Sequence, residues 1–285
     1  MNKKILVLGS TGLLGSVLLR HFSKDFEVIG HSYTNKEADI VFDINNTNKL
    51  KEALESIQPD ILLNCIAMTN VDHCEIFKEK ATILNEKVLI DICKFKKKST
   101  WVVHFSTDHV YDIDQLNKEE DHRLSNHYSL TKFNSEKYVL DSGGLVLRTN
   151  FFGHSYNHIK KTFNEWLDHQ KKAQNKFKII KDVYFSPISL ESLCLKLDII
   201  FKKYFYLNSL FNLGSSTFMS KKDFAFYIFD IIGYPIKGYF NLVNANDLFQ
   251  TYRPKFMQMD ISKITKIIGE MPSLEDEIKR CYEKY

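Results

Sequence analysis

Tyr128 and Lys132 are a pair of residues whose types and spacing suit chemistry. They lie four positions apart, so a helix would place the phenol and the ammonium one turn apart on the same face. A phenol with a pKa of about 10 exchanges protons poorly at neutral pH, but a nearby cation favours the phenolate and lowers that pKa. The pair therefore predicts a proton-transferring group, with Lys132 expected to lower the pKa of Tyr128. Tyr-x-x-x-Lys pairs also arise by chance in many helices. The position of this pair in the fold must therefore show whether it has a catalytic role.

A hydroxyl-bearing residue, Thr107, follows the apolar run Trp101–Ser106, which is typical of a central strand. Ligands of open α/β sheets bind at the carboxyl ends of strands. Thr107 is therefore expected to donate a hydrogen bond to a substrate carbonyl or alkoxide. Ser106 is expected to face away because side chains alternate along a strand. Asp108 is expected to bond backbone N–H groups of the loop rather than to take part in chemistry.

Three glycines, Gly9, Gly12 and Gly15, stand between the first apolar run and the first helical pattern. Gly9 would allow a tight turn, Gly12 the close approach of a pyrophosphate, and Gly15 the close packing of helix on strand. The helix N-terminus would offer unpaired N–H groups to the phosphates. An ordinary strand-to-helix turn is the alternative, but the position directly after a clean strand favours a dinucleotide site. The predicted site also includes Thr11, Leu13 and Leu14.

The end of the second predicted strand indicates which dinucleotide binds. An acidic residue there would bond the ribose hydroxyls of NAD and repel a 2′-phosphate, and none is present. Ser32 and Lys36, with His31 as a third candidate, could hold a 2′-phosphate, which favours NADPH with NADH as the alternative. A solvated loop lysine is the competing interpretation of Lys36. Asp43 and Ile44 are expected to flank the adenine.

Strand and helix patterns alternate along the first half of the chain. The run Lys4–Gly9 is continuously apolar, as in a strand buried on both faces of a parallel sheet. The alternation predicts βαβ units and a Rossmann-type, doubly wound parallel sheet. Further strands are expected at Glu27–Ser32, Asp39–Asp43, Asp60–Ile66, Trp101–Ser106 and Leu145–Arg148. Helices are expected to begin at Leu13 and to cover Asn48–Ile57, Val71–Phe95 and Tyr128–Leu140.

After Asn150 the pattern loosens and predicts a smaller C-terminal α+β domain. We therefore expect an NADP-binding Rossmann domain over 1–150 and a mainly substrate-binding domain over 151–285, some of whose segments return to the Rossmann sheet. Its helices are expected at His158–Lys171, Leu190–Tyr204, Lys221–Ile232 and from Leu274 onward, and its strands at Phe177–Ile180 and Phe211–Leu213.

Composition excludes several classes of protein. Lys and Arg exceed Asp and Glu by 39 to 35, a net charge of +4 that is too small and scattered to indicate a nucleic-acid partner. The start lacks the pattern of a signal peptide, and no run reaches the roughly 20 apolar residues that span a bilayer. The five cysteines lack disulfide or zinc spacing. We expect a cytoplasmic protein with no metal, nucleic-acid or membrane partner, and a homodimer is left open.

These motifs together resemble the dTDP-4-dehydrorhamnose reductase family of extended short-chain dehydrogenase/reductases. Two residues separate each pair of neighbouring glycines, and this spacing resembles the one found in the extended short-chain dehydrogenase/reductases. The similarity extends along nearly the whole chain, through Gly9–Gly15, Asn64–Ala67, Val71, Asp72, Glu75, Asn85, Ser106–Asp108, Tyr128–Lys132, Leu147–Thr149, Gly153, Pro187, Arg253, Pro254, Met259 and Asp260.

The resemblance implies NADPH-dependent reduction of the 4-keto group of a nucleotide-linked 6-deoxy-4-ketosugar, in the synthesis of surface-polysaccharide sugars. It implies that Thr107, Tyr128 and Lys132 form a catalytic triad and that Lys132 also bonds the nicotinamide ribose. Ala67 and Met68 would line the cofactor groove, with Asn64 and Asn85 structural or near the cofactor. Substrate contacts would come from Thr107, Asp108, His109, Asn150, Phe151, Phe152 and Arg253.

Departures from the family pattern concern the sugar site. His109 and Tyr111 stand in the segment after the triad threonine, where the family usually has tyrosine and phenylalanine. Asn150–Phe152 and Phe185–Ser189 also differ from the usual sequence. The triad is intact, so these changes leave the chemistry in place and the identity of the sugar open.

Two other functions remain open. The same family includes a non-catalytic NADP-binding regulatory subunit of methionine adenosyltransferase, against which the intact triad argues. A sugar-nucleotide epimerase or dehydratase of the same fold would also use the tyrosine and the lysine. Dehydratases commonly follow the threonine with Asp-Glu, whereas Thr107 is followed here by Asp108 and His109.

Overall fold

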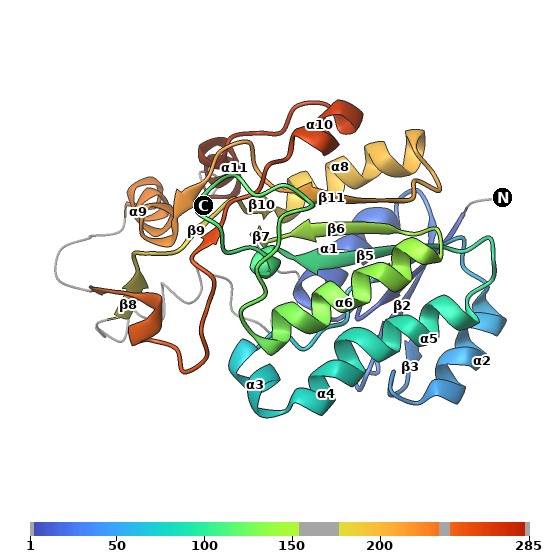
Figure 1. The fold of residues 1–285 in the computed structure, drawn as a ribbon. Helices are drawn as coiled ribbons and strands as arrows, with labels where there is room; N and C mark the ends of the chain where they lie inside the picture. The colour runs from blue at the N-terminus through green and yellow to red at the C-terminus, as the bar shows by residue number, and fades with distance from the viewer. Residues whose placement is uncertain (1–2, 154–176, 234–239, 283–285) are drawn as a thin grey trace.

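The structure is a computed structural model that describes residues 3–153, 177–233 and 240–282 (Figure 1). Within these residues, one parallel sheet has the strand order β11-β6-β5-β4-β1-β2-β3. The Rossmann-type fold expected from the sequence is confirmed. The strands are β1 (Lys4–Leu8), β2 (Glu27–Ser32), β3 (Ile40–Val41), β4 (Ile61–Asn64), β5 (Trp101–Thr107), β6 (Leu145–Thr149) and β11 (Ser209–Leu213). β3 is shorter than expected because it is the edge strand, which pairs only with β2.

Helices cover both faces of this sheet (Figure 1). In β1, Ile5 and Val7 join the core on one face, and Leu6 and Leu8 join the core on the other. This alternation with a period of two explains why β1 is apolar at every position from Ile5 to Leu8. The first face is covered by α1 (Leu13–Phe22), α8 (Leu190–Lys203) and α10 (Ser262–Ile268). The second is covered by α2 (Thr47–Ile57), α5 (Val88–Phe95) and α6 (His127–Asp141).

The prediction of a single long helix over Val71–Phe95 is wrong. The segment forms α3 (Val71–Ile76), α4 (Lys78–Thr82), a π-helical turn η1 (Ile83–Lys87) and α5. Phe77 interrupts it with a φ of −113° and a ψ of 55°. The π-helical turn carries the buried side chain of Asn85, which bonds the backbone of Met68 through both its oxygen and its nitrogen. Tertiary hydrogen bonding therefore overrides the regular helical period here.

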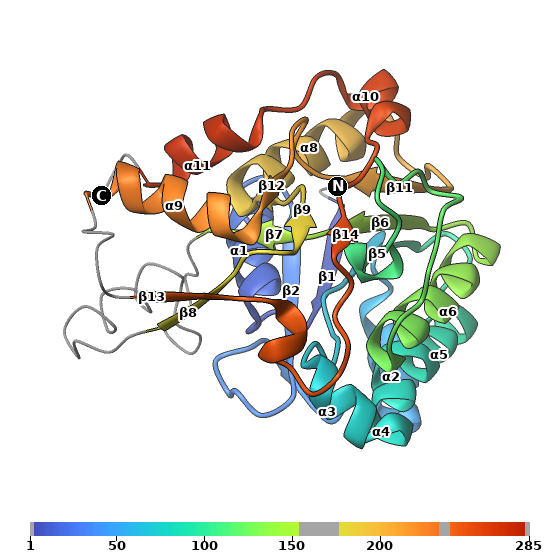
Figure 2. The ribbon, with the colours of Figure 1, turned by 60° about the vertical axis from the view of Figure 1, so that its left-hand side comes forward.

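Small β-elements and two helices form a second core, to one side of the large sheet (Figure 2). The paired strands are β7 (Phe151–Phe152) with β10 (Ile188–Ser189), and β8 (Phe177–Ile180) with β13 (Phe240–Val243). β9 (Tyr184–Phe185) lies between β12 (Met219–Ser220) and β14 (Phe256–Met257). The helices are α9 (Lys221–Ile231) and α11 (Leu274–Tyr282), and short 3₁₀ turns are η2 (Asp108–Val110) and η3 (Ala245–Asp247).

Two segments from the second half of the chain belong to the large sheet. β11 is its edge strand beside β6, and α8 packs on the first face. The division of the chain at residue 150 into two functional domains stays a prediction. The helix expected over His158–Lys171 lies outside the described residues. Across the described ranges, no helix has the length and apolar character needed to cross a membrane.

Candidate active site

A cavity of about 970 Å³ opens at the carboxyl ends of the strands, where the strand order reverses between β1 and β4. This is where open α/β sheets bind ligands. Most of the residues expected at the site line it. They are Gly9, Thr11, Gly12, Leu13, Leu14, Asp43, Ile44, Ala67, Met68, Thr107, Asp108, His109, Tyr128, Lys132, Asn150 and Phe151.

The glycine turn has the geometry that its sequence predicts. Gly9 has a φ of +78°, which an L side chain rarely adopts. A Cβ on Gly15 would collide with the carbonyl oxygen of Gly9, so α1 can lie this close to β1 only without a side chain there. Gly12 is the N-cap of α1, with no side-chain cap and no acidic residue in the first turn. The first N–H groups of α1 are therefore left for an anion, which fits the pyrophosphate of a dinucleotide.

Thr107 and Tyr128 meet at the cavity wall. Thr107 ends β5 and Tyr128 lies in the first turn of α6, and their hydroxyls are hydrogen-bonded. Asn126 caps α6 by accepting from Ser129 N–H at 2.9 Å, which begins the helix just before Tyr128. Both side chains are almost fully buried, at 5% and 8% exposure. The two hydroxyls can therefore contact one substrate oxygen together.

Lys132 lies one turn further along α6 and is held on β5. Its Nζ donates to the carbonyl oxygen of Phe105 at 2.7 Å and is 3.1 Å from His104 Nε2. Burial lowers the pKa of Lys132 to about 7, against the opposing effects of Glu136 and Cys65. The side chain is 2% exposed, so its charge is sensitive to its few neighbours.

Burial also raises the pKa of Tyr128 to about 12, although the hydrogen bond from Thr107 opposes this. The direction is opposite to the one expected from Lys132, because desolvation of the phenolate is the largest effect and the charges of Asp108 and Cys74 add to it. Tyr128 is therefore a neutral phenol at physiological pH. That is the form required of a proton donor.

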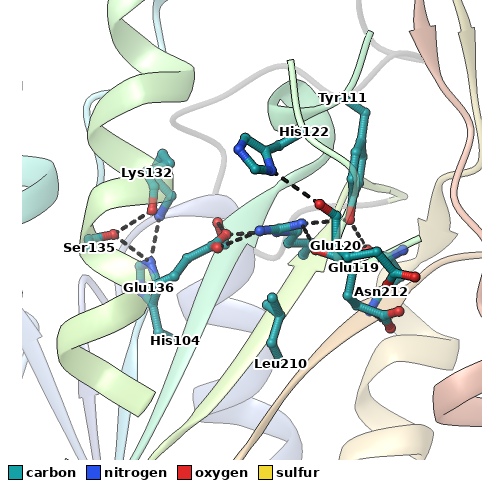
Figure 3. A network of polar contacts seen from close by, with 12 residues as sticks. His104, Tyr111, Glu119, Glu120, His122, Lys132, Ser135, Glu136, Leu210 and Asn212 are labelled. Atoms are coloured by element: carbon teal, nitrogen blue, oxygen red, sulfur yellow. Dashed lines mark hydrogen bonds and ion pairs between the residues drawn. The ribbon is translucent and has the colours of Figure 1, made fainter. Parts of the chain in front are cut away.

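A buried ion pair fixes α6 to the sheet. Arg148 on β6 donates to both carboxylate oxygens of Glu136 on α6, at 2.9 and 2.7 Å. Glu136 also accepts from Ser106, whose side chain points to α6, away from Thr107, as expected from strand alternation. Arg148 donates to the hydroxyl of Tyr111 at 2.8 Å. Tyr111 departs from the family pattern, and its hydroxyl is part of this hydrogen-bond network (Figure 3).

Asp108 and His109 flank Thr107 on the other side. The Asp108 carboxylate accepts from Asn150 Nδ2 at 2.8 Å, and burial raises its pKa to about 6. Asp108 was expected to bond backbone N–H groups of the loop, but its carboxylate accepts from the side chains of Asn150 and Thr107, and its own N–H is the backbone group that contributes. The ring of His109 packs edge-on against Tyr128, with 5.5 Å between centroids. Burial, with Lys221 and Arg253 nearby, lowers the pKa of His109 to about 3, so its ring is neutral.

Five expected site residues do not line the cavity. Gly15 lies in α1, where its lack of a side chain lets the helix pack closely on the glycine turn. Ser32 is buried and accepts from Asn35 N–H at 2.9 Å, and Lys36 is exposed. Phe152 points into the second core, where its ring lies 5.1 Å from that of Phe224. Arg253 pairs with Asp72 at 2.9 Å and stacks on Phe249.

Several lining residues were not predicted from the sequence. Tyr33 and Lys80 line the cavity, Tyr33 just after the end of β2 and Lys80 on α4, and His31, the third candidate for the 2′-phosphate, lines it as well. Lys221, at the start of α9, does not line the cavity, but it interacts electrostatically with Asp108 and His109, and its side chain makes no hydrogen bond or salt bridge among the described residues. A lysine at the start of a helix gives no sign in the sequence that it lies near Asp108 and His109. In the described ranges, His, Cys, Asp and Glu form no group of three that could hold a metal.

A family model described as RmlD substrate binding domain matches residues 3–285. The chain belongs to this family. A dTDP-4-dehydrorhamnose reductase of Salmonella typhimurium is 30% identical over 66% of this chain and 64% of its own length. A probable low-salt glycan biosynthesis reductase, Agl14 of Haloferax volcanii, is 25% identical over 95% of both chains. The family resemblance inferred from the motifs is confirmed.

Solved structures agree on the fold. The dTDP-4-dehydrorhamnose reductase of Bacillus anthracis, determined in complex with NADP, superimposes with a TM-score of 0.88 over 100% of both chains. Its sequence is 19% identical, so this likeness concerns the arrangement of the chain.

Proposed function

We propose that this protein reduces the 4-keto group of a nucleotide-linked 6-deoxy-4-ketosugar with NADPH. The observation that carries the proposal is the meeting of Thr107, Tyr128 and Lys132 on one wall of the cavity that also contains the glycine turn. The names of the family relatives support the same reaction class. The residues that line the cavity run from Gly9 to Phe151, so its walls come almost wholly from the part of the chain that forms the large sheet.

NADPH fits the residues present. The uncapped N-terminus of α1 and Gly12 would take the pyrophosphate, and Asp43 and Ile44 would flank the adenine. Lys80 is a better candidate for a 2′-phosphate than Lys36, because Lys80 lines the cavity and Lys36 does not. Lys132 would bond the nicotinamide ribose. When bound, the cofactor supplies the hydride.

In the proposed reaction, Thr107 and Tyr128 bind the substrate carbonyl oxygen between their hydroxyls. As negative charge grows on that oxygen, both hydrogen bonds strengthen, which lowers the barrier. Tyr128 then gives its proton to the alkoxide, a transfer that is downhill because an alkoxide is a far stronger base than a phenolate with a pKa of about 12. Lys132 compensates the charge left on Tyr128.

Substrate contacts would come from Asp108, His109, Asn150 and Phe151, all at the cavity wall. We add Lys221, whose half-buried side chain lies near Asp108 and makes no salt bridge among the described residues, because a second anion would offset the cost of burying this cation. The substrate diphosphate is such an anion. Arg253 would join it only after exchanging its ion pair with Asp72, and Phe152 would act through packing.

Two alternatives make different predictions. A regulatory subunit would bind NADPH without turning over a ketosugar. An epimerase or dehydratase would regenerate its cofactor and would need a strong base beside Thr107, whereas the pKa of His109 is lowered to about 3. The neutral phenol of Tyr128, which can donate a proton, favours the reductase.

A screen of NADPH oxidation against a panel of nucleotide 4-ketosugars tests the proposal. Tyr128→Phe should lower kcat by about 10²–10⁴-fold with the best substrate, because it removes the proton donor and keeps the ring. NADPH binding, followed by fluorescence, should be nearly unchanged. Full activity of this variant, or no oxidation with any ketosugar, would overturn the reductase assignment, and partner capture would then test the regulatory role.

A further inference from the structure

His104 lies in the middle of β5, completely buried between β4 and α6. Its Nε2 is 3.1 Å from Lys132 Nζ and 3.4 Å from Ser135 Oγ, and its Nδ1 is 3.1 Å from Asn64 Nδ2. Figure 3 shows Lys132, Ser135 and His104 joined by dashed lines where α6 passes over β5. Apart from the Phe105 carbonyl, the imidazole is the hydrogen-bonding partner of Nζ among the described residues.

The hydrogen bonds of Asn64 decide which nitrogen of His104 carries the proton. Asn64 Oδ1 accepts from the N–H of Ile66 at 3.3 Å, so Nδ2 donates to His104 Nδ1. Burial and Lys132 hold the pKa of His104 well below 6.5, so the ring is neutral. Its single proton is therefore on Nε2, the nitrogen that faces Lys132.

This tautomer favours one charge state of Lys132. An N–H at Nε2 can donate to Nζ only when Nζ is an uncharged amine, because an ammonium has no lone pair to accept with. The other titratable groups facing Lys132 are Glu136 on α6 and Cys65 after β4, and both favour the ammonium. His104 acts in the opposite direction, and Glu136 is already paired with Arg148.

We propose that His104 is a positioning residue that fixes Lys132 at the cavity wall, and that the tautomer imposed on it by Asn64 sets the charge of the Lys132 side chain. Only the kinetic consequence rests on the proposed function, since the charge of Lys132 is a property of the protein alone. Asn64 and His104 pair across β4 and β5, so the two central strands act together on one side chain of α6.

The pKa of Lys132 is the direct test, measured by NMR titration of protein labelled with ¹³C at lysine Cε. The Lys132 signal is identified by its absence from Lys132→Met. His104→Leu removes the donor that favours the amine, so the pKa of Lys132 should rise. In Asn64→Asp the carboxylate accepts from Nδ1–H, which leaves a lone pair on Nε2 for the ammonium, so the rise should be larger, about tenfold in proton affinity or more.

The double variant separates this route from a direct attraction by the new carboxylate. If Asn64 acts through His104, adding Asn64→Asp to His104→Leu should change the pKa of Lys132 little. A shift of the same size in both backgrounds, or a fall of the pKa in His104→Leu, would overturn the proposal. Ser135→Ala is the matched control, since Ser135 is as buried and lies near the same nitrogen without contacting Nζ. Ser135→Ala should leave the pKa of Lys132 unchanged.

A kinetic measurement connects the inference to turnover. With a ketosugar from the screen, the pH above which kcat/KM falls should rise in step with the Lys132 titration in Asn64→Asp. His104→Leu should also lower kcat about tenfold with little change in the KM for NADPH. If the parent protein reduces no ketosugar while the NMR shifts occur, the proposed function fails and the role of His104 stands. A kinetic shift without an NMR shift would refute that role.

Discussion

Replacing Lys132 with methionine should stabilise the protein while abolishing its activity. Lys132 is 2% exposed, and burial lowers its pKa from 10.5 to about 7. At about 1.4 kcal/mol for each tenfold change in proton affinity, keeping the ammonium buried costs on the order of 5 kcal/mol. The variant removes one partner from the carbonyl of Phe105 and one from the ring of His104, which keeps its contact with Asn64, at a total cost of about 1–3 kcal/mol. We therefore expect a net gain of about 2–4 kcal/mol at pH 6.

The dependence of this gain on pH is the sharper expectation. Below pH 7 Lys132 is charged in both the folded and the unfolded chain, so the cost of burial is fully present. Between about pH 7 and 10.5 the unfolded chain keeps the proton and the folded protein has released it, so the stability of the parent rises with pH. The advantage of Lys132→Met should therefore shrink by about 3 kcal/mol between pH 6 and 9.5.

Urea unfolding followed by circular dichroism at several pH values measures both quantities. Lys137→Met, at an exposed position of the same helix, is the control and should change the free energy of unfolding by less than about 0.5 kcal/mol. An advantage that stays constant between pH 6 and 9.5, or a variant less stable than the parent at pH 6, would refute the reasoning. The first result would mean that water reaches Nζ in the folded protein.

Three further substitutions test the assignments of individual positions. Phe151→Ala should raise the KM for the ketosugar with little loss of stability, whereas Phe152→Ala should cost about 3–5 kcal/mol in unfolding free energy and leave the KM unchanged; the reverse pattern would reverse their roles. Gly15→Ala should lower Tm and weaken NADPH binding in a fluorescence titration, because the new Cβ collides with the carbonyl of Gly9. Glu136→Gln should cost about 3–5 kcal/mol in urea unfolding, since it leaves the Arg148 guanidinium buried without its carboxylate; a neutral result would show that this ion pair does not anchor α6.

The sheet and the glycine turn could be predicted because their causes are local. A strand buried on both faces is expected to be apolar on both, and β1 shows this directly from Ile5 to Leu8. Gly9 and Gly15 were predicted from the conformation and the close packing that a strand-to-helix turn requires, and both requirements hold. The meeting of Thr107 with Tyr128 also follows from the sequence, once β5 and the helix after it are recognised.

Other features depend on contacts between distant parts of the chain. Phe151 and Phe152 are adjacent in a two-residue strand, so one must point opposite to the other, but the sequence does not say which faces the cavity. Arg253 was assigned to a diphosphate by its type, and its ion pair with Asp72 joins residues 181 positions apart. His104 did leave a signal, namely a polar residue inside an apolar strand in register with Asn64 on the neighbouring strand. Its significance required the position of Lys132.

The two shifted pKa values at the site favour one direction of the proposed reaction. Burial raises the pKa of Tyr128 to about 12 and lowers that of Lys132 to about 7, so the site resists charge on either side chain. Oxidation of an alcohol would need the phenolate of Tyr128 as a base, and that form is scarce at neutral pH. Reduction needs the neutral phenol, which is present throughout the physiological range. Burial disfavours the charged forms of both side chains, and it therefore keeps Tyr128 protonated and able to donate its proton in the reduction.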